Sequence, residues 1–321
     1  MVSSEFILRA KRAWIFLFML GFAISMMGMW ILWPEPTNRQ AVSITLKPSD
    51  FKALAPQKVA THTVAKLEER FLRIGYNLEA IRLNENEVPR VSADSVPYDM
   101  DRIQVVSKRK DLFIGMMLPL VLIANERLEA EREKLIDIAE IKENGDQINP
   151  ADQRWLDAKF EDYKVKDESI KALLKRLDVV PPSLAVAQAA IESGWGTSRF
   201  AREGNALFGQ WTWGEDGIVP ESRETDKSHK IKAFQSPLDS VTSYIKNLNT
   251  HRAYRMLRDL RQAARKNAAP LDGNQLAIAL TSYSEKGMEY VDLVRLIIRV
   301  NGLQHLDDAR LASGEITPSR V

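Results

Sequence analysis

The sequence predicts a mainly helical α+β protein that is preceded by one transmembrane helix. Three observations support this prediction: a charge-free apolar run at residues 13–33, several segments with apolar residues at helical spacing, and short β-like stretches at residues 42–46 and 220–234. The chain has 321 residues, of which 45% are hydrophobic and 27% are charged. These proportions are those of folded proteins and exclude wholesale disorder, and the length suits roughly two domains.

Charge and composition exclude several classes of function. The 45 basic and 43 acidic residues leave a formal charge of +2, so no strong overall field attracts nucleic acid. The lack of cysteine excludes disulfides, a thiolate nucleophile and cysteine-ligated metal sites. The 4 histidines form neither an HExxH nor an HxxxH motif. We therefore expect no metal, no cofactor and no nucleic-acid partner.

Residues 13–33 are predicted to span a membrane. As a helix, roughly 20 apolar residues cross the hydrocarbon core, and Trp14 at one end and Trp30 and Trp33 at the other suit the two interfaces. Basic residues within residues 1–12 favour a cytoplasmic tail, which places the rest of the chain across the inner membrane. A cleaved signal peptide is the alternative, but the run is long and no clear A-x-A site follows it.

Beyond this segment the sequence divides into four regions. Residues 34–110 read as a stem or linker, with a predicted helix over residues 61–75 and a polar stretch over residues 84–110. Residues 111–164 form a helical extension, in which the apolar run 112–124 is too short to span a membrane and is expected to be a buried core helix. Residues 165–305 hold the densest motifs and are the predicted catalytic domain, followed by a C-terminal tail over residues 306–321.

A candidate catalytic acid lies at the end of a predicted helix. Ser183 is a plausible N-cap, and Gly194 suits the residue that ends the helix. Glu192 then falls in the last turn, beside Trp195, where the helix dipole and apolar surroundings both raise its pKa. A protonated carboxylic acid is what a glycosidase needs to protonate a leaving-group oxygen. A solvated glutamate at a helix end is the alternative.

Aromatic side chains follow this helix closely, and sugar rings stack well on aromatic faces. Two amides nearby offer hydrogen bonds to sugar hydroxyl or acetamido groups, although Asn205 equally suits a role in holding its turn. We therefore predict a carbohydrate-active site with these substrate-binding residues: Trp195, Asn205, Phe208, Gln210, Trp211 and Trp213.

Two sequence blocks make this prediction more specific. AQAAIESGWGTSRF occupies residues 187–200, and GNALFGQW follows at residues 204–211. In this order they resemble the glucosaminidase domain of glycoside hydrolase family 73, and more closely the bacterial Bax-type proteins. Further similar stretches are residues 217–220, 234–258 and 280–297. The resemblance covers roughly residues 165–305 and, more weakly, reaches back to about Leu112.

The resemblance implies a lysozyme-like, mainly helical fold with a small β-hairpin. It also implies hydrolysis of β-1,4 glycosidic bonds at N-acetylglucosamine in peptidoglycan or a related glycan, with Glu192 as general acid. The family's tyrosine before its final helix corresponds to Tyr283, in a loop that is altered here. It implies that Tyr283 positions the catalytic water or steadies positive charge at the anomeric carbon. A tyrosine that caps the last helix is the alternative.

Several groups are candidates for the second catalytic role. An inverting enzyme needs a base about 6.5–9.5 Å from the acid. In the wider family a glutamate on a β-hairpin takes this role, and residues 220–234 can form that hairpin. Glu224, just before the turn of this hairpin, is the first candidate for the base. Glu221 is the candidate if the position is counted back from Phe234. Asp216 is a distant third candidate. If none serves, the 2-acetamido group of the substrate can assist the displacement.

Two other functions fit the same residues. A lytic transglycosylase needs only one acid/base glutamate and yields an anhydro-sugar without water, so product chemistry separates it from a hydrolase. A non-catalytic glycan-binding or scaffold protein keeps the groove but lacks the base, so a carboxylate far from Glu192 would favour it.

Overall fold

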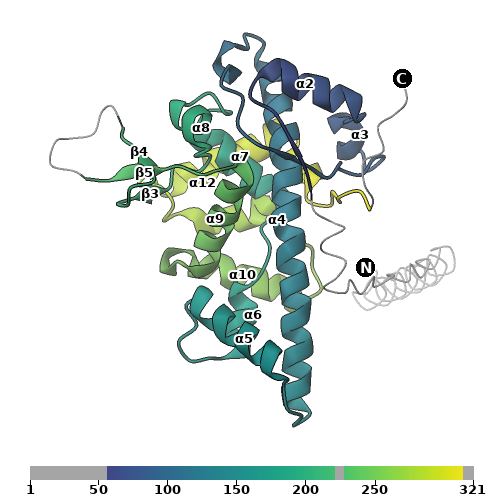
Figure 1. The fold of residues 1–321 in the computed structure, drawn as a ribbon, viewed down its shortest axis with the longest axis vertical. Coiled ribbons are helices and arrows are strands. Elements are labelled where there is room, and N and C mark those ends of the chain that lie inside the picture. The colour runs from purple at the N-terminus through teal and green to yellow at the C-terminus, as the bar shows by residue number, and fades with distance from the viewer. Residues whose placement is uncertain (1–55, 221–227, 314–321) are drawn as a thin grey trace, which may run out of the picture. The chain divides into compact units, whose positions relative to one another are not determined.

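The structure is a computed structural model and describes residues 56–220 and 228–313. The described part is mainly helical with two small sheets (Figure 1). Its α-helices are α2 (Val64–Arg73), α3 (Leu78–Arg82), α4 (Val106–Glu143), α5 (Pro150–Asp162), α6 (Ile170–Arg176), α7 (Pro182–Ser193), α8 (Arg199–Gly204), α9 (Pro237–Thr250), α10 (Arg255–Lys266), α11 (Gly273–Leu276) and α12 (Met288–Val300). Short 3₁₀ helices are η2 (Met100–Arg102), η3 (Arg252–Tyr254), η4 (Ala277–Leu280) and η5 (Leu303–Leu306).

The two sheets are short. Strand β1 (Gln57–Val59) pairs in parallel with β2 (Val91–Ala93). The second sheet has the order β3-β5-β4, with β3 (Trp211–Thr212) and β4 (Gly217–Ile218) both antiparallel to β5 (Lys230–Lys232). The predicted hairpin over residues 220–234 therefore contributes β5 within the described residues, while residues 221–227 and the predicted strand 42–46 lie outside them.

Helix α4 is the central element of the fold. Figure 1 shows it running along the molecule, with α7 and α9 packed against it and α5 and α6 beside its C-terminal half. Its residues 112–124 are almost all buried, because this apolar run faces neighbouring helices on nearly every side. The prediction of a buried core helix over residues 112–124 is confirmed.

One part of the predicted fold class needs correction. Among the helices of residues 56–220 and 228–313, none is both long and apolar enough to cross a membrane, so the predicted architecture with a transmembrane helix has no support in the structure. The predicted inner-membrane localisation and membrane partner rested on that helix and are corrected with it. The predicted span itself, residues 13–33, lies outside the described residues.

The described part of the predicted stem is folded. Residues 56–104 form β1, α2, α3, β2 and η2, and their apolar side chains join the main core; Val88 and Met100 are fully buried. Two polar contacts attach this region to other parts of the fold. Arg90 forms a bidentate pair with Glu126 of α4 at 2.6 Å, and the backbone N–H of Val96 donates to Asn205 Oδ1 at 3.0 Å.

Helix α7 lies at the centre of the core and carries the predicted acid. Its alanines allow close packing, and Gly194 ends it in the left-handed conformation (φ 59°), as predicted. The residue at the N-cap is Pro181, not Ser183 as predicted. Ser183 lies inside the helix, where its backbone N–H and hydroxyl both donate to the Asp307 carboxylate, at 2.8 and 2.7 Å. A carboxylate from the far end of the chain thus replaces the local cap.

Replacing Asp307 by alanine is expected to lower the free energy of unfolding by about 3 kcal/mol, because hydrogen bonds to a charged group contribute about 1.5–3 kcal/mol. The change leaves the donors of Ser183 and the backbone N–H of Gly273 without their shared acceptor. Urea denaturation measures the difference. The exposed neighbour Asp308, changed to alanine, is the control. Equal stability of the two variants would show that the Asp307 contacts do not hold α7.

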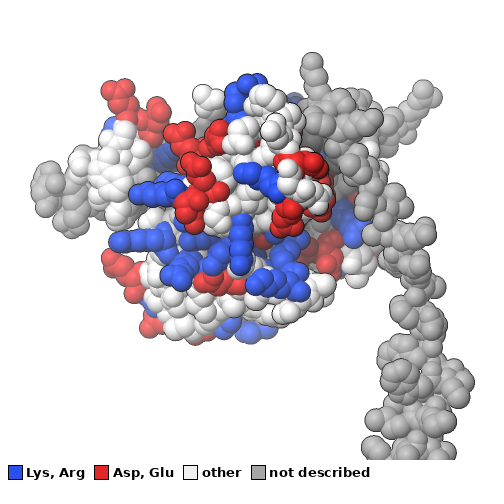
Figure 2. All heavy atoms as spheres, turned by 90° about the horizontal axis from the view of Figure 1, so that it is seen from below, with Lys and Arg blue, Asp and Glu red and all other residues white. Residues whose placement is uncertain are grey.

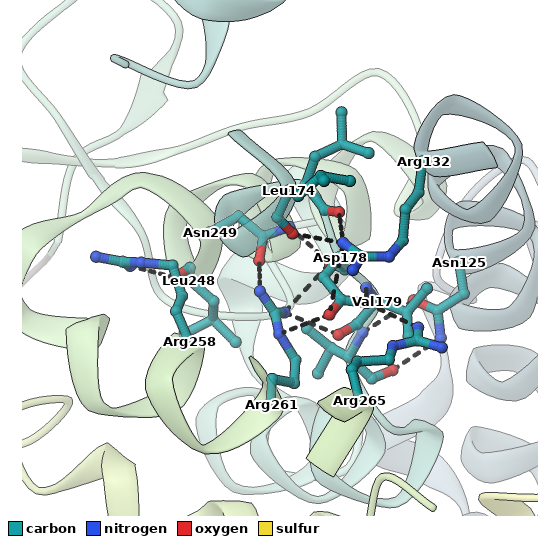
Figure 3. Close-up of polar contacts among 12 residues, drawn as sticks. Asn125, Arg132, Leu174, Asp178, Val179, Leu248, Asn249, Arg258, Arg261 and Arg265 are labelled. Atoms are coloured by element: carbon teal, nitrogen blue, oxygen red, sulfur yellow. Dashed lines mark hydrogen bonds and ion pairs between the residues drawn. The ribbon is translucent and has the colours of Figure 1, made fainter. Parts of the chain in front are cut away.

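A buried ionic cluster fixes the segment that leads into α7 (Figure 3). Asp178 is buried; it accepts a hydrogen bond from Arg265 at 2.8 Å and lies 3.7 Å from Arg261. Arg261, which is fully buried, also donates to Asn249 Oδ1 and to the Val179 carbonyl. Burial opposes the charge of Asp178, but the surrounding arginines outweigh it and hold the pKa of the carboxyl below its usual range. The cluster therefore joins α9 and α10 to the start of α7.

One face of the molecule carries side chains of both charges. Figure 2 shows Lys and Arg gathered in a band across the face seen from below, with Asp and Glu among and beside them. Elsewhere in the described part, ion pairs also join helices, such as that of Lys175 on α6 with Asp259 on α10. The face therefore combines both signs of charge, in keeping with the small net charge of the chain.

Candidate active site

Glu192 lies in the last turn of α7, half-buried, with its carboxylate held by a tyrosine from α12. The Tyr290 hydroxyl donates to Glu192 Oε1 at 2.7 Å. Burial raises the pKa of the Glu192 carboxyl, and the Tyr290 hydrogen bond opposes this rise only in part. The position at the C-terminal end of α7 acts in the same direction as burial. Glu192 is therefore a carboxyl group that favours its protonated form more than an ordinary glutamate does.

A chain of hydrogen bonds leads to this carboxylate through the core. The Tyr244 hydroxyl donates to Gln188 Oε1 at 2.6 Å, and Gln188 Nε2 contacts the Tyr290 hydroxyl at 3.1 Å. Gln188 and Glu192 are four residues apart, so they share one face of α7. Every donor in the chain points toward Glu192 Oε1. The chain therefore fixes one carboxylate oxygen and leaves the other, Oε2, for a different partner.

The second oxygen faces the loop after α8. A Cβ added at Gly209 would lie 3.7 Å from Glu192 Oε2, so the glycine backbone comes close to the carboxylate. Gly209 also has a φ of +60°, which glycine adopts without a steric penalty. The ESGWG block carries the Glu192 carboxylate, and the NALFG block carries Gly209, which lies opposite Oε2. This contact explains why the two blocks occur together.

Aromatic rings from three helical segments surround Glu192. Tyr283 stacks on Tyr290 with ring centroids 5.4 Å apart, and Tyr254 lies 6.0 Å from Tyr283. The Tyr283 hydroxyl donates to the Phe208 carbonyl at 3.2 Å, and Phe208 itself is buried in a stack on Tyr244, 3.9 Å between centroids. The structure thus places Tyr283, the predicted catalytic tyrosine, in the same group of rings as Tyr290. Its hydroxyl holds the Phe208 loop.

Tyr290 and Gln188 are functional candidates that the sequence analysis missed. Tyr290 stands in the quoted block that contains Tyr283, seven residues later at the start of the last helix, and Gln188 stands in the block of Glu192. Gln188 could have been found in the sequence, because it is a polar residue on the same face as Glu192 in a helix that is otherwise rich in alanine. Nothing in the local pattern distinguishes the two tyrosines.

The predicted substrate-binding residues fall into different environments. Trp211 and Trp213 are 61% and 70% exposed on and beside β3, where Trp211 also stacks on His229. Trp195 packs edge-on against Phe113 of α4 and lies under the Lys110 ammonium.

The remaining three predicted residues have structural contacts. Asn205 donates to the Phe234 carbonyl and accepts from the Val96 N–H, and Phe208 has no free face. The Gln210 side-chain N–H contacts the Ser243 carbonyl at 3.4 Å, while its Oε1 is buried with no hydrogen-bond partner in the described part of the chain. The described geometry therefore offers Trp211 and Trp213 as stacking surfaces, and places Asn205 and Phe208 in the framework of the loop.

The candidates for a second carboxylate are only partly described. Glu224 and Glu221 lie outside the described residues. Asp216 lies in the turn between β3 and β4, where its carbonyl accepts from the Ala233 N–H. The role of a catalytic base stays a prediction for all three.

Comparison with known proteins places this site in a family. Residues 154–301, which include Glu192, Tyr283 and Tyr290, match the glucosaminidase family described as mannosyl-glycoprotein endo-beta-N-acetylglucosaminidase. The chain is 31% identical over 239 residues to Protein bax of Escherichia coli (strain K12), an alignment that covers 72% of this chain and 83% of that protein. It is 25% identical over 134 residues to Exo-glucosaminidase LytG of Bacillus subtilis (strain 168), covering 40% of this chain and 47% of that protein. No solved structure matches.

Proposed function

Because the chain belongs to the family of Bax-type proteins with a glucosaminidase domain, we propose that it hydrolyses β-1,4 glycosidic bonds at N-acetylglucosamine in peptidoglycan or a related glycan. The observation that carries the proposal is the half-buried Glu192 carboxyl, whose pKa is raised and whose Oε2 faces the loop of the second motif. In the proposed mechanism Glu192 is the general acid.

The geometry suggests how the proton is delivered. Tyr290 donates to Oε1, so the acidic proton is carried on Oε2, the oxygen next to the Gly209 loop, and passes from there to the glycosidic oxygen. Protonation of that oxygen lets the C–O bond break, and Glu192 becomes a carboxylate. The Tyr290 hydrogen bond then stabilises the new charge, because hydrogen bonds to an ionised acceptor are the stronger ones. A water molecule completes hydrolysis at the anomeric carbon, with Glu224 as the first candidate for its base.

The surrounding residues have proposed roles in binding. The exposed faces of Trp211 and Trp213 offer stacking surfaces for sugar rings, and they lie on the sheet that follows the Gly209 loop. Tyr283 positions the loop through the Phe208 carbonyl and adds to the aromatic wall next to Tyr290.

Replacing Tyr290 by phenylalanine is expected to shift the alkaline limb of the kcat–pH profile upward by about one unit, since a hydrogen bond to a charged group contributes about 1.5 kcal/mol. The hydrogen bond is what lowers the pKa of Glu192, whereas burial, which raises it, stays in place. The acid thus remains protonated to a higher pH. Kinetics on a soluble glycan between pH 4 and about 9 measure the shift. The half-exposed Tyr98, changed to phenylalanine, is the control and should leave the profile unchanged. A downward shift for Tyr290→Phe would contradict the assigned contact.

Digestion of purified peptidoglycan tests the proposed function. The full-length protein is incubated with the polymer, the released fragments are reduced with borohydride, and the reduced sugar is identified by mass spectrometry. The proposal predicts new reducing ends at N-acetylglucosamine. New reducing ends only at N-acetylmuramic acid, or tight sedimentation on the polymer without release, would overturn it.

A further inference from the structure

A half-open cavity of about 470 Å³ lies between α4, α5, α9 and β5. It begins beside the loop that faces Glu192. Gln210, the residue after Gly209, contacts two residues that line the cavity: its side-chain N–H reaches the Ser243 carbonyl, and its carbonyl accepts from the Lys232 N–H at 2.8 Å. Gln210 therefore connects the cavity to the loop that faces Glu192.

The walls of the cavity carry more positive than negative charge. Its charged lining residues are Arg127, Lys159, Lys232, Lys246, Glu131 and Asp239. Within residues 56–220 and 228–313, neither Arg127 nor Lys232 has an ion-pair partner. The Lys232 ammonium instead lies over the Phe234 ring, 5.2 Å from its centroid. An anion that enters the cavity thus finds cations whose charge is not already neutralised.

Two lysines are held in place by their neighbours. Lys159 pairs with Glu131, and Lys246 lies 3.6 Å from Asp162 and 3.7 Å from the centroid of the buried Tyr163 ring. Burial lowers the pKa of Lys246, and the nearby charge of Asp162 opposes this shift. Both lysines are therefore ordered, and each already has a carboxylate as its partner.

The rest of the lining is apolar. Ala124, Leu128 and Ile245 supply aliphatic surface, and Tyr163 and Phe234 supply aromatic surface. A ligand that fits such a cavity combines a carboxylate with small apolar side chains. A neutral sugar offers neither, whereas a short peptide-like branch with a free carboxylate offers both.

We infer that this cavity binds the carboxylate of a short peptide-like branch on the glycan that is placed at Glu192. The inference rests on the proposed function, because the occupant is a branch of the proposed substrate. Arg127 and Lys232 attract the carboxylate, and the apolar wall takes the side chains. The chain thereby distinguishes a peptide-bearing glycan from an unbranched polymer of N-acetylglucosamine.

A binding experiment tests this inference apart from cleavage. Full-length Glu192→Gln protein is titrated with soluble peptidoglycan fragments that carry peptide branches, and with the same fragments after their carboxyl groups have been converted to neutral amides. The released peptide alone is a third ligand. Each is repeated with Lys232→Gln and with Arg127→Gln/Lys232→Gln. Lys142→Gln, an exposed lysine in the last turn of α4, is the matched control. Thermal unfolding checks that each variant folds.

We expect amidation of the ligand to weaken binding about tenfold, and the Arg127→Gln/Lys232→Gln variant to weaken binding of the acidic fragments by a similar factor of about ten. The variant should not weaken binding of the amidated fragments further, because both changes remove the same interaction. The peptide alone should bind more weakly than the branched glycan. Equal loss on acidic and amidated fragments, or tighter binding of the free peptide, would overturn the inference. If the inference is overturned in this way, cleavage of both kinds of fragment by the unmodified protein would still support the proposed function.

Discussion

Replacing Glu192 by glutamine is expected to reduce the rate of glycan cleavage by about 10²–10⁴-fold, the range that general acid catalysis contributes. Glutamine keeps the shape of the side chain, and its carbonyl oxygen can still accept from the Tyr290 hydroxyl. It has no acidic proton to give to the leaving oxygen. The initial rate of release of soluble fragments from peptidoglycan measures the loss.

Binding should survive this change, so sedimentation of the variant on the polymer should match that of the unmodified protein. Glu203 on α8 is a suitable control, because it is an exposed glutamate whose contact is an ion pair with Arg199. Glu203→Gln should cleave normally. Full activity of Glu192→Gln would remove Glu192 from the chemistry.

Replacing Asp178 by asparagine is expected to lower the free energy of unfolding by about 3–5 kcal/mol, the cost of breaking a buried ion pair on one side. Asparagine is similar in size but leaves the buried Arg261 without the charge that balances it, whereas Arg265 keeps its ion pair with Glu129 (Figure 3). Arg261 is fully buried, so solvent cannot replace the lost partner. Urea denaturation at neutral pH measures the loss.

The same cluster gives stability a pH dependence of defined sign. The pKa of Asp178 is lowered in the folded state, so its contribution is complete above its unfolded value of about 3.9 and is lost as the pH falls through the folded value. Asp178→Asn should therefore show a weaker acid dependence. Replacing the half-exposed Asp259 by asparagine should lower the free energy of unfolding by at most about 1 kcal/mol. Equal losses for Asp178 and Asp259 would contradict the role of the cluster.

Local sequence patterns predicted the elements that bury a continuous apolar surface. The run at residues 112–124 and the alanine-rich α7 follow from hydrophobicity and helical spacing, and the end of α7 follows from Gly194. The direction of the Glu192 pKa shift could be anticipated because its cause, burial, follows from the apolar residues around the end of the helix.

Contacts between distant parts of the chain could not be predicted in this way. Tyr290 is 98 residues from Glu192, and Asp307 is 124 residues from Ser183. Which tyrosine reaches the carboxylate depends on how α12 packs on α7, and no local pattern specifies that packing. The same holds for Asn205, whose local sequence suits a sugar ligand as well as a turn. Residues 56–104 were predicted to be part of a stem because polar residues separate their apolar ones. The structure buries those apolar side chains in the main core.

Hydrolysis in water enriched in ¹⁸O tests the central claim most directly, because it reports both the bond that is cut and the entry of water. The full-length protein digests peptidoglycan in this solvent, and mass spectrometry reads the new ends. The account predicts that each new reducing N-acetylglucosamine carries one ¹⁸O atom, and that Glu192→Gln slows its formation about 10²–10⁴-fold. Anhydro-sugar ends without ¹⁸O would contradict hydrolysis and identify a lytic transglycosylase instead.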